Sequence, residues 1–141
     1  MSEENVERHR AIYRAINTRD AEALVAICDP KIEIQSVFAA VSGARYHGHD
    51  GARDWQADLW EAWGGEFAVE IEAYFDLGDR TIVIGALRGR GAQSGADVST
   101  PASAVAEWRD GLCTSHIAYP RHEAVFEELG ISAGQLEPIA P

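Results

Sequence analysis

The feature that most constrains the fold is a tight turn between two strand-like segments near the C-terminus. Residues 98–108 (VSTPASAVAEW) and 112–119 (LCTSHIAY) are separated by the short segment RDG. Such a turn predicts a hairpin of two antiparallel strands. Residues 66–75 alternate apolar and charged side chains, residues 80–90 are almost continuously apolar, and DLGD separates them. The C-terminal half therefore predicts an antiparallel sheet, with residues 67, 69, 71, 73 and 75 sharing one face.

The N-terminal half is dominated by helical patterns. Apolar residues recur at helical spacing over 4–17 and 51–63, and Asp20 is placed to cap a second helix that runs to about Cys28. Residues 31–38 alternate like a half-buried strand, and a loop is expected from there to the third helix. A short helix ends at Gly130, and residues 131–141 form a loose tail. Helices followed by hairpins predict one α+β domain over 1–141, with helices covering one face of a curved antiparallel sheet.

Composition excludes several classes of protein. Twelve basic residues against 23 acidic ones give a net charge of −11, and no basic cluster is present to bind nucleic acid or an anionic membrane. No apolar run is long enough to span a bilayer. The first ten residues are polar and lack the apolar core of a signal peptide, so we expect a cytoplasmic protein. Cys28 and Cys113 lack metal-ligand spacing and are expected to be reduced, buried thiols. No metal or cofactor is expected.

The order of these segments resembles a known family. NVERHRAIYRAINTRDAEALVAICDPKIEI, YHGHDGARDWQADLWEAW, DRTIVIGALRGRGAQSG and EWRDGLCTSHIAYPRHEAVFEELGI are similar to the SnoaL-like branch of the nuclear transport factor 2-like superfamily, over residues 5–131. The resemblance implies a cone-shaped sheet wrapped around three N-terminal helices, with a short C-terminal helix. It also implies a deep pocket and frequent dimers. Members include isomerases, cyclases, epoxide hydrolases and non-catalytic binders, so the fold leaves the function open.

Two activities of the superfamily lack their residues here. Aligned by segment, the carboxylates of ketosteroid isomerase fall at Ser36 and near Ala104, and its tyrosine falls at Ile12, one residue from Tyr13. Limonene epoxide hydrolase needs an arginine between two aspartates, and the aspartates have no counterpart here. Arg88 and Arg90 lie on the central strand, but no aspartate lies inside the last three strands. We therefore expect neither activity.

His116 is the candidate acid/base. Imidazole titrates near neutral pH, and some family members carry a histidine where His116 stands. We expect Leu112, Thr114, His116 and Ala118 to share one strand face. The alternative is a core histidine that only fills space. The other histidines are expected at exposed positions: residues 47 and 49 in a loop, and residues 9 and 122 on helix surfaces.

A row of small side chains adjoins this strand. Ala102, Ala104 and Ala106 recur with period two and end at Trp108. Such a row either widens a pocket or allows a helix or a dimer partner to pack closely, and the sequence leaves both possibilities open. The residues that we expect to line a pocket are Phe38, Tyr46, Trp55, Leu59, Ala104, Ala106, Trp108 and Thr114.

Two functions remain. The first is a pocket for an apolar or aromatic compound, with cofactor-free isomerase, cyclase or lyase chemistry at His116 and with Tyr13 or Arg88 orienting the ligand. The second is a non-catalytic binding or dimerisation module, for which the pocket would hold no paired polar groups or would be filled by side chains. In either case we expect a homodimer through the outer sheet face, with Val83 and Leu87 as apolar contacts.

Overall fold

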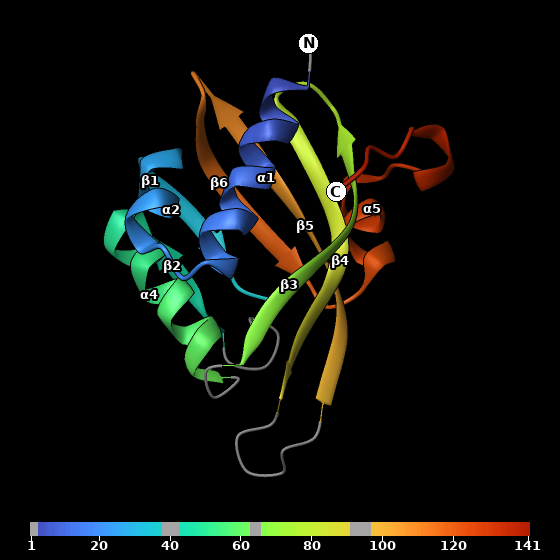
Figure 1. Ribbon diagram of the computed structural model, residues 1–141. Coiled ribbons are helices and arrows are strands. Elements are labelled where there is room, and N and C mark those ends of the chain that lie inside the picture. The colour runs from blue at the N-terminus through green and yellow to red at the C-terminus, as the bar shows by residue number, and fades with distance from the viewer. Residues whose placement is uncertain (1–2, 38–42, 63–65, 91–96) are drawn as a thin grey trace.

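The chain folds as a mixed α+β domain, shown by a computed structural model that describes residues 3–37, 43–62, 66–90 and 97–141 (Figure 1). The helices and strands, in chain order, are α1 (Glu4–Asn17), α2 (Ala21–Ile27), β1 (Cys28–Gln35), β2 (Arg45–His47), α4 (Gly48–Ala62), β3 (Phe67–Asp76), β4 (Arg80–Arg90), β5 (Asp97–Arg109), β6 (Leu112–Tyr119), α5 (His122–Leu129) and the 3₁₀ turn η1 (Ala133–Gln135). Within the described ranges, every helix is too short or too polar to span a bilayer.

The strands form one curved, open sheet in the order β2-β1-β6-β5-β4-β3. The predicted hairpins are confirmed. Asp110 and Gly111 connect β5 to β6 with φ of 52° and 81°, the left-handed values that a two-residue turn of this kind requires. Two expectations were wrong: β1 pairs with β6 in parallel, and part of the expected loop is strand β2, which pairs antiparallel with β1.

Two β-bulges interrupt the predicted side-chain alternation. In β3 the register shifts between Ile71 and Ala73, which leaves Glu72 as an extra residue opposite β4. In β6 Cys113 pairs with Trp108 and Ser115 pairs with Glu107, so Thr114 is the extra residue. Each bulge changes which side chains point inward. We predicted that alternate residues of 67–75, and alternate residues of 112–118, share one face of the sheet along the whole segment. Both predictions were therefore wrong.

The two sides of the sheet are covered by different elements. α1, α2 and α4 lie on one side, and α5 lies on the other (Figure 1). The larger apolar cluster, between the sheet and the N-terminal helices, includes Phe67, Tyr74 and Val83, whereas the smaller cluster, under α5, includes Phe75 and Ile82. Val83 and Leu87 are buried in the larger cluster. The expectation that these two residues form an outer contact surface was therefore wrong.

Specific hydrogen bonds hold the helices in place. Asp20 caps α2 by accepting from the backbone N–H of Ala23, as predicted. The Asn17 side chain bonds both backbone groups of Val69, at 2.7 and 3.0 Å, which ties the end of α1 to β3. Gly130 ends α5 with a left-handed φ of 66°. The structure also ties down the tail that we expected to be loose, because Ile139 pairs with Tyr74 through two backbone hydrogen bonds.

Candidate functional site

A small cavity lies between the N-terminal helices and the inner face of the sheet. Its volume is about 40 Å³, which is room for a few water molecules at roughly 10–15 Å³ each. Ligand pockets usually measure about 300–1,000 Å³. The cavity is almost wholly apolar, and it is lined by Tyr13, Ile16, Val37, Trp55, Leu59, Val69, Leu87, Ala102, Ser103, Ala104, His116 and Ala118.

His116 and Tyr13 form a hydrogen-bonded pair in the wall of this cavity. Tyr13 comes from α1 and His116 from β6, and the tyrosine hydroxyl lies 2.9 Å from Nε2 of the imidazole. Trp55 of α4 also packs against the imidazole, with its ring centroid 5.0 Å from that of His116. Only 1% of His116 is exposed, and its Nδ1 has no hydrogen-bond partner among the described residues. The predicted candidate is therefore a buried, partly satisfied histidine beside an open volume.

A second buried histidine, His9, lies next to this pair. Its ring stacks on Tyr13 at a centroid distance of 5.3 Å and meets His116 edge-on at 5.5 Å. Nδ1 of His9 lies 2.8 Å from the Thr81 hydroxyl oxygen, which also accepts the indole N–H of Trp108 at 2.8 Å. His9 is fully buried. The expectation that it lies on a helix surface was wrong, because it shares the inner face of α1 with Tyr13, four residues later.

The contact at Thr81 is compatible with either tautomer of His9. The Trp108 indole is only a donor, so Thr81 accepts that bond and keeps one proton and one further lone pair. Thr81 can therefore donate to Nδ1 of His9 or accept from it. Nε2 of His9 lacks a partner among the described residues. Burial lowers the pKa of His9 well below 6.5, and the neighbouring His116 lowers it further.

His116 and Tyr13 are also held in their neutral forms. Burial lowers the pKa of His116 to about 4 and raises the pKa of Tyr13 well above 10. The hydrogen bond between them allows two arrangements, since either partner can supply the proton. If Tyr13 donates, Nδ1 of His116 carries the imidazole proton. If His116 donates through Nε2, Nδ1 is a free base and the tyrosine proton is available to a ligand.

Several predicted residues meet at the cavity. Tyr13, Trp55, Leu59, Ala104 and His116 all line it. The alanine row faces the same interior, where Ala102 and Ala104 line the cavity and Ala106 is fully buried beside His116. The row therefore borders open space at one end and is packed at the other.

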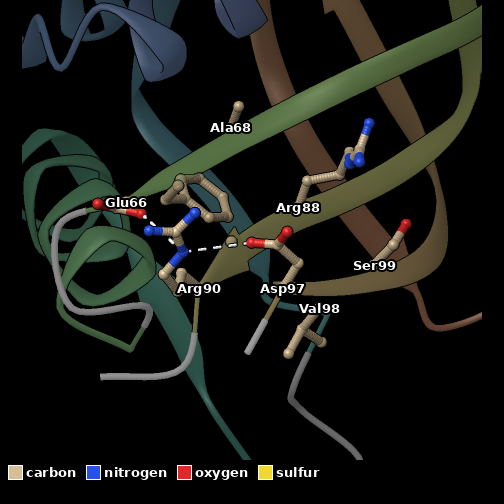
Figure 2. A pocket seen from close by; sticks show the side chains of 9 residues that line it. Glu66, Ala68, Arg88, Arg90, Asp97, Val98 and Ser99 are labelled. Carbon is tan, nitrogen blue, oxygen red and sulfur yellow. Dashed lines mark hydrogen bonds and ion pairs between the residues drawn. The ribbon is translucent and has the colours of Figure 1, made fainter. Parts of the chain in front are cut away.

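Arg88 lies away from His116. Its side chain is about half exposed and bonds Glu70 at 2.7 Å on the outer side of the sheet. It lines a different, shallow surface hollow (Figure 2). There Arg90 lies between Glu66 and Asp97, 3.4 and 3.2 Å from their carboxylate oxygens. Arg88 does not line the cavity, so the structure does not bring it to the proposed acid/base.

Other predicted residues are also elsewhere. Tyr46 donates its hydroxyl to the Asp58 carboxylate at 2.6 Å near the surface. Trp108 packs beyond the cavity against Thr81. Thr114 occupies the bulge and bonds the Glu107 carbonyl at 3.3 Å. Phe38 lies outside the described residues.

The lining also contains residues that were not predicted to line a pocket, namely Ile16, Val37, Val69, Ser103 and Ala118. Helical spacing contained one usable signal, since Val6, His9, Tyr13 and Ile16 recur at intervals of three and four and are all buried. Val37 and Val69 have no comparable signal, because their place at the cavity depends on how the strands are arranged around α1.

The cysteines are free and buried, as expected. Burial raises the pKa of Cys28 to about 12 and also raises that of Cys113, so both stay protonated thiols at neutral pH. Among the described residues, no group of three or more His, Cys, Asp or Glu side chains is placed to hold a metal ion.

Comparisons with known proteins agree with this geometry. The model of the SnoaL-like domain matches residues 9–116, which is more than half of the chain. The chain belongs to this family. A search of curated proteins finds no match.

Solved structures show the same fold at low identity. A protein with a ketosteroid isomerase-like fold from Catenulispora acidiphila, in complex with trimethylamine, is 18% identical, with a TM-score of 0.72 over 91% of this chain and 95% of its own. TerC, co-crystallised with polyporic acid, is 22% identical, with a TM-score of 0.71 over 89% and 97%. A nuclear transport factor 2-like protein of unknown function from Burkholderia pseudomallei is 19% identical, with a TM-score of 0.72 over 90% and 97%. These similarities establish the fold.

Proposed function

We propose that the protein binds an apolar or aromatic small molecule beside Tyr13 and His116. We further propose cofactor-free proton transfer there, of isomerase, cyclase or lyase type, in the cytoplasm. The observation that carries the proposal is the 2.9 Å Tyr13–His116 pair in the wall of an apolar cavity. Two structural relatives contain small molecules, trimethylamine and polyporic acid, which supports a binding role.

The arrangement suits proton transfer next to a carbonyl group. When His116 donates through Nε2 to the tyrosine oxygen, Nδ1 has a free lone pair and the tyrosine proton points elsewhere. Nδ1 then accepts a proton from the carbon beside a ligand carbonyl. The electron pair of that C–H bond moves to the carbonyl oxygen, which Tyr13 stabilises by donating its hydrogen bond. Return of the proton to another carbon completes an isomerisation. In a cyclisation the enolate carbon instead attacks a second carbonyl carbon of the ligand, the π bond of that carbonyl breaks, and its oxygen takes the proton from His116.

The pKa of the base restricts the substrates. A histidine with a pKa near 4 is a weak base. It removes protons efficiently only from carbons that are already acidic, such as the carbon between two carbonyl groups. We therefore expect a 1,3-dicarbonyl or a comparably activated compound as substrate.

A second function is favoured by the size of the cavity. At about 40 Å³ the cavity is too small for an aromatic ring, as expected for a module that binds without catalysis or that forms dimers. The hydrogen-bonded pair of Tyr13 and His116 in the cavity wall instead favours catalysis. Catalysis therefore needs the cavity to enlarge when a ligand enters.

A simple diketone tests the catalytic proposal. We expect the protein to accelerate the keto–enol interconversion of benzoylacetone, followed by its ultraviolet absorbance. His116→Gln should lower the rate roughly 100-fold or more, because general acid–base groups contribute at least that much. His122→Gln is the matched control, since His122 bonds the Gly85 carbonyl on the other side of the sheet.

The outcomes separate catalysis from binding. An unchanged rate in His116→Gln, with the fold retained by circular dichroism, would end the catalytic claim. Binding is measured separately with the neutral fluorophore N-phenyl-1-naphthylamine. We expect it to bind and to shift the imidazole ¹⁵N resonances of His116. If it leaves those resonances unchanged, the binding proposal fails as well.

A further inference from the structure

A larger hollow adjoins the buried cavity at the ends of β1 and β6. Its volume is about 370 Å³. We call it the rim hollow, and the described residues that line it are Gln35, Ser36, Val37, Gly43, Arg45, Ala118, Tyr119 and Pro120. Val37 and Ala118 also line the buried cavity. The two spaces therefore share a wall that contains these two small or medium-sized side chains.

The charge of the rim hollow differs from that of the other surface hollows. Its described lining contains Arg45 and no carboxylate. The hollow of Figure 2 contains Glu66 and Asp97 beside its arginines, and the one near His122 contains Glu70 and Glu72. In a chain with a net charge of −11, a hollow with one cation and no described acid is locally favourable to an anion.

The guanidinium of Arg45 is available for binding. Its side chain is exposed and has no hydrogen bond or ion pair within the described part of the chain. Arg45 also lines a smaller hollow that contains Glu33, but those two residues form no ion pair. By contrast, Arg88 and Arg90 are paired with carboxylates. An arginine fork without a partner is suited to a carboxylate or sulfonate.

The strand register sets the distance between this cation and the cavity. Arg45 pairs with Gln35 on β1, and Gln35 pairs with Ile117 on β6, next to His116. Two strand spacings separate Arg45 from Ile117, or about 10 Å between Cα atoms. Residues paired in this way share a sheet face, so Arg45 lies on the side opposite His116. The rim hollow lies where both strands end, which is where a ligand can extend from the interior to Arg45.

We propose that the rim hollow and the buried cavity together bind one ligand, an aromatic compound with an anionic group. This inference rests on the proposed function and adds its ligand class. The ring displaces Val37 and packs against Trp55 and His116, while the anion binds Arg45 at the exposed rim. An anion placed there stays partly hydrated, whereas inside the apolar cavity it would lose its hydration without a compensating cation.

Two fluorophores that differ by one sulfonate test this proposal. 1-Anilinonaphthalene-8-sulfonate is the anionic probe, and N-phenyl-1-naphthylamine is its neutral counterpart. We expect the anionic probe to bind at least tenfold tighter at low salt and to lose most of that advantage at high salt. Arg45→Gln should weaken it about tenfold and leave the neutral probe within twofold. Arg109→Gln removes the same charge from an exposed position outside these hollows and should change neither.

Val37 provides a second, independent variant. Val37→Ala should tighten both probes because it removes part of the shared wall, and Val37→Trp should weaken both. Thermal unfolding confirms that each variant is folded. Equal affinity of the two probes, or an unchanged preference in Arg45→Gln, would overturn the anionic ligand class. In that case, a shift of the His116 resonances by the neutral probe would still support the proposed function. Failure of the neutral probe to reach His116 would overturn that function itself.

Discussion

The two buried histidines lie 5.5 Å apart and have different surroundings. His116 bonds a tyrosine and borders an open volume, whereas His9 bonds Thr81 and is packed among aromatic rings. Each has one satisfied nitrogen and one without a partner among the described residues. Burial lowers the pKa of both.

This comparison shows which observation distinguishes a candidate site from the core. Burial, a lowered pKa and an unpaired nitrogen are common to both residues, so none of them identifies a site. Adjacent free volume does distinguish them, because the lining of the cavity includes His116 and does not include His9. The Thr81–His9–Tyr13 contacts form a packed support for the cavity wall.

The largest expected effect is a loss of stability in mild acid that both histidines share. The unfolded chain binds protons on these residues near pH 6.5, but the folded chain binds one on His116 only near pH 4. Because the unfolded state binds more protons, stability falls as the pH drops below about 6.5. From pH 7 to pH 5 the loss is about 2 kcal/mol for His116, and the lowered pKa of His9 adds a loss of the same sign.

Urea unfolding at pH 7 and pH 5 measures this loss. His116→Gln should reduce the difference in stability between the two pH values by about 2 kcal/mol, and His9→Gln should also reduce it. His47→Gln is the control, because the His47 side chain is 70% exposed. Equal stability of the wild type at both pH values would contradict the neutral, buried state of both histidines.

The next largest loss of stability is expected when the Thr81 hydroxyl, which contacts His9, is removed. Thr81→Val keeps the shape but leaves the Trp108 indole and Nδ1 of His9 without their partner. We expect a destabilisation of about 2–4 kcal/mol, because each unsatisfied buried group costs about 1–3 kcal/mol. Tyr13→Phe removes one bond and should cost about 1–2 kcal/mol. Chemical denaturation measures both, with Thr81→Ser as the control. If Tyr13→Phe lost more stability than Thr81→Val, the Tyr13–His116 pair, and not the contacts of Thr81 with His9, would be the main support of the cavity wall.

The alanine row offers a smaller test of where the free volume lies. Ala106→Val adds atoms to a packed position and should cost about 1–3 kcal/mol. Ala104→Val extends into the cavity and should cost less than about 1 kcal/mol. The melting temperatures of the two variants give the comparison. Equal losses would mean that the space beside Ala104 cannot accept the two added methyl groups.

The smallest effect is expected at Arg88. Its ion pair with Glu70 is exposed, so Arg88→Gln should change stability by less than about 1 kcal/mol. The affinity for N-phenyl-1-naphthylamine should stay within twofold, because Arg88 lies outside the cavity lining. A substantial loss of probe binding would restore Arg88 as a ligand-orienting residue.

Most elements were predictable because their signals are local. Asp20, the Asp110–Gly111 turn and Gly130 mark boundaries through their own backbone and hydrogen-bonding preferences. Strand β2 was missed because three residues give too short a pattern to read. The parallel pairing of β1 with β6 was missed because strands far apart in the chain carry no local record of their pairing.

The sequence by itself determined the order of helices and hairpins, the stripe of α1 that includes Tyr13, and the presence of a histidine in the last strand. Only the tertiary structure decided which side chains meet. The bulge at Thr114 turns both Cys113 and His116 inward, and the bulge at Glu72 separates Ile71 from Ala73. A bulge depends on how a strand pairs with its neighbour, so strict alternation fails beyond it. Tyr13 and His116 are 103 residues apart, and folding α1 against the sheet is what brings them into contact.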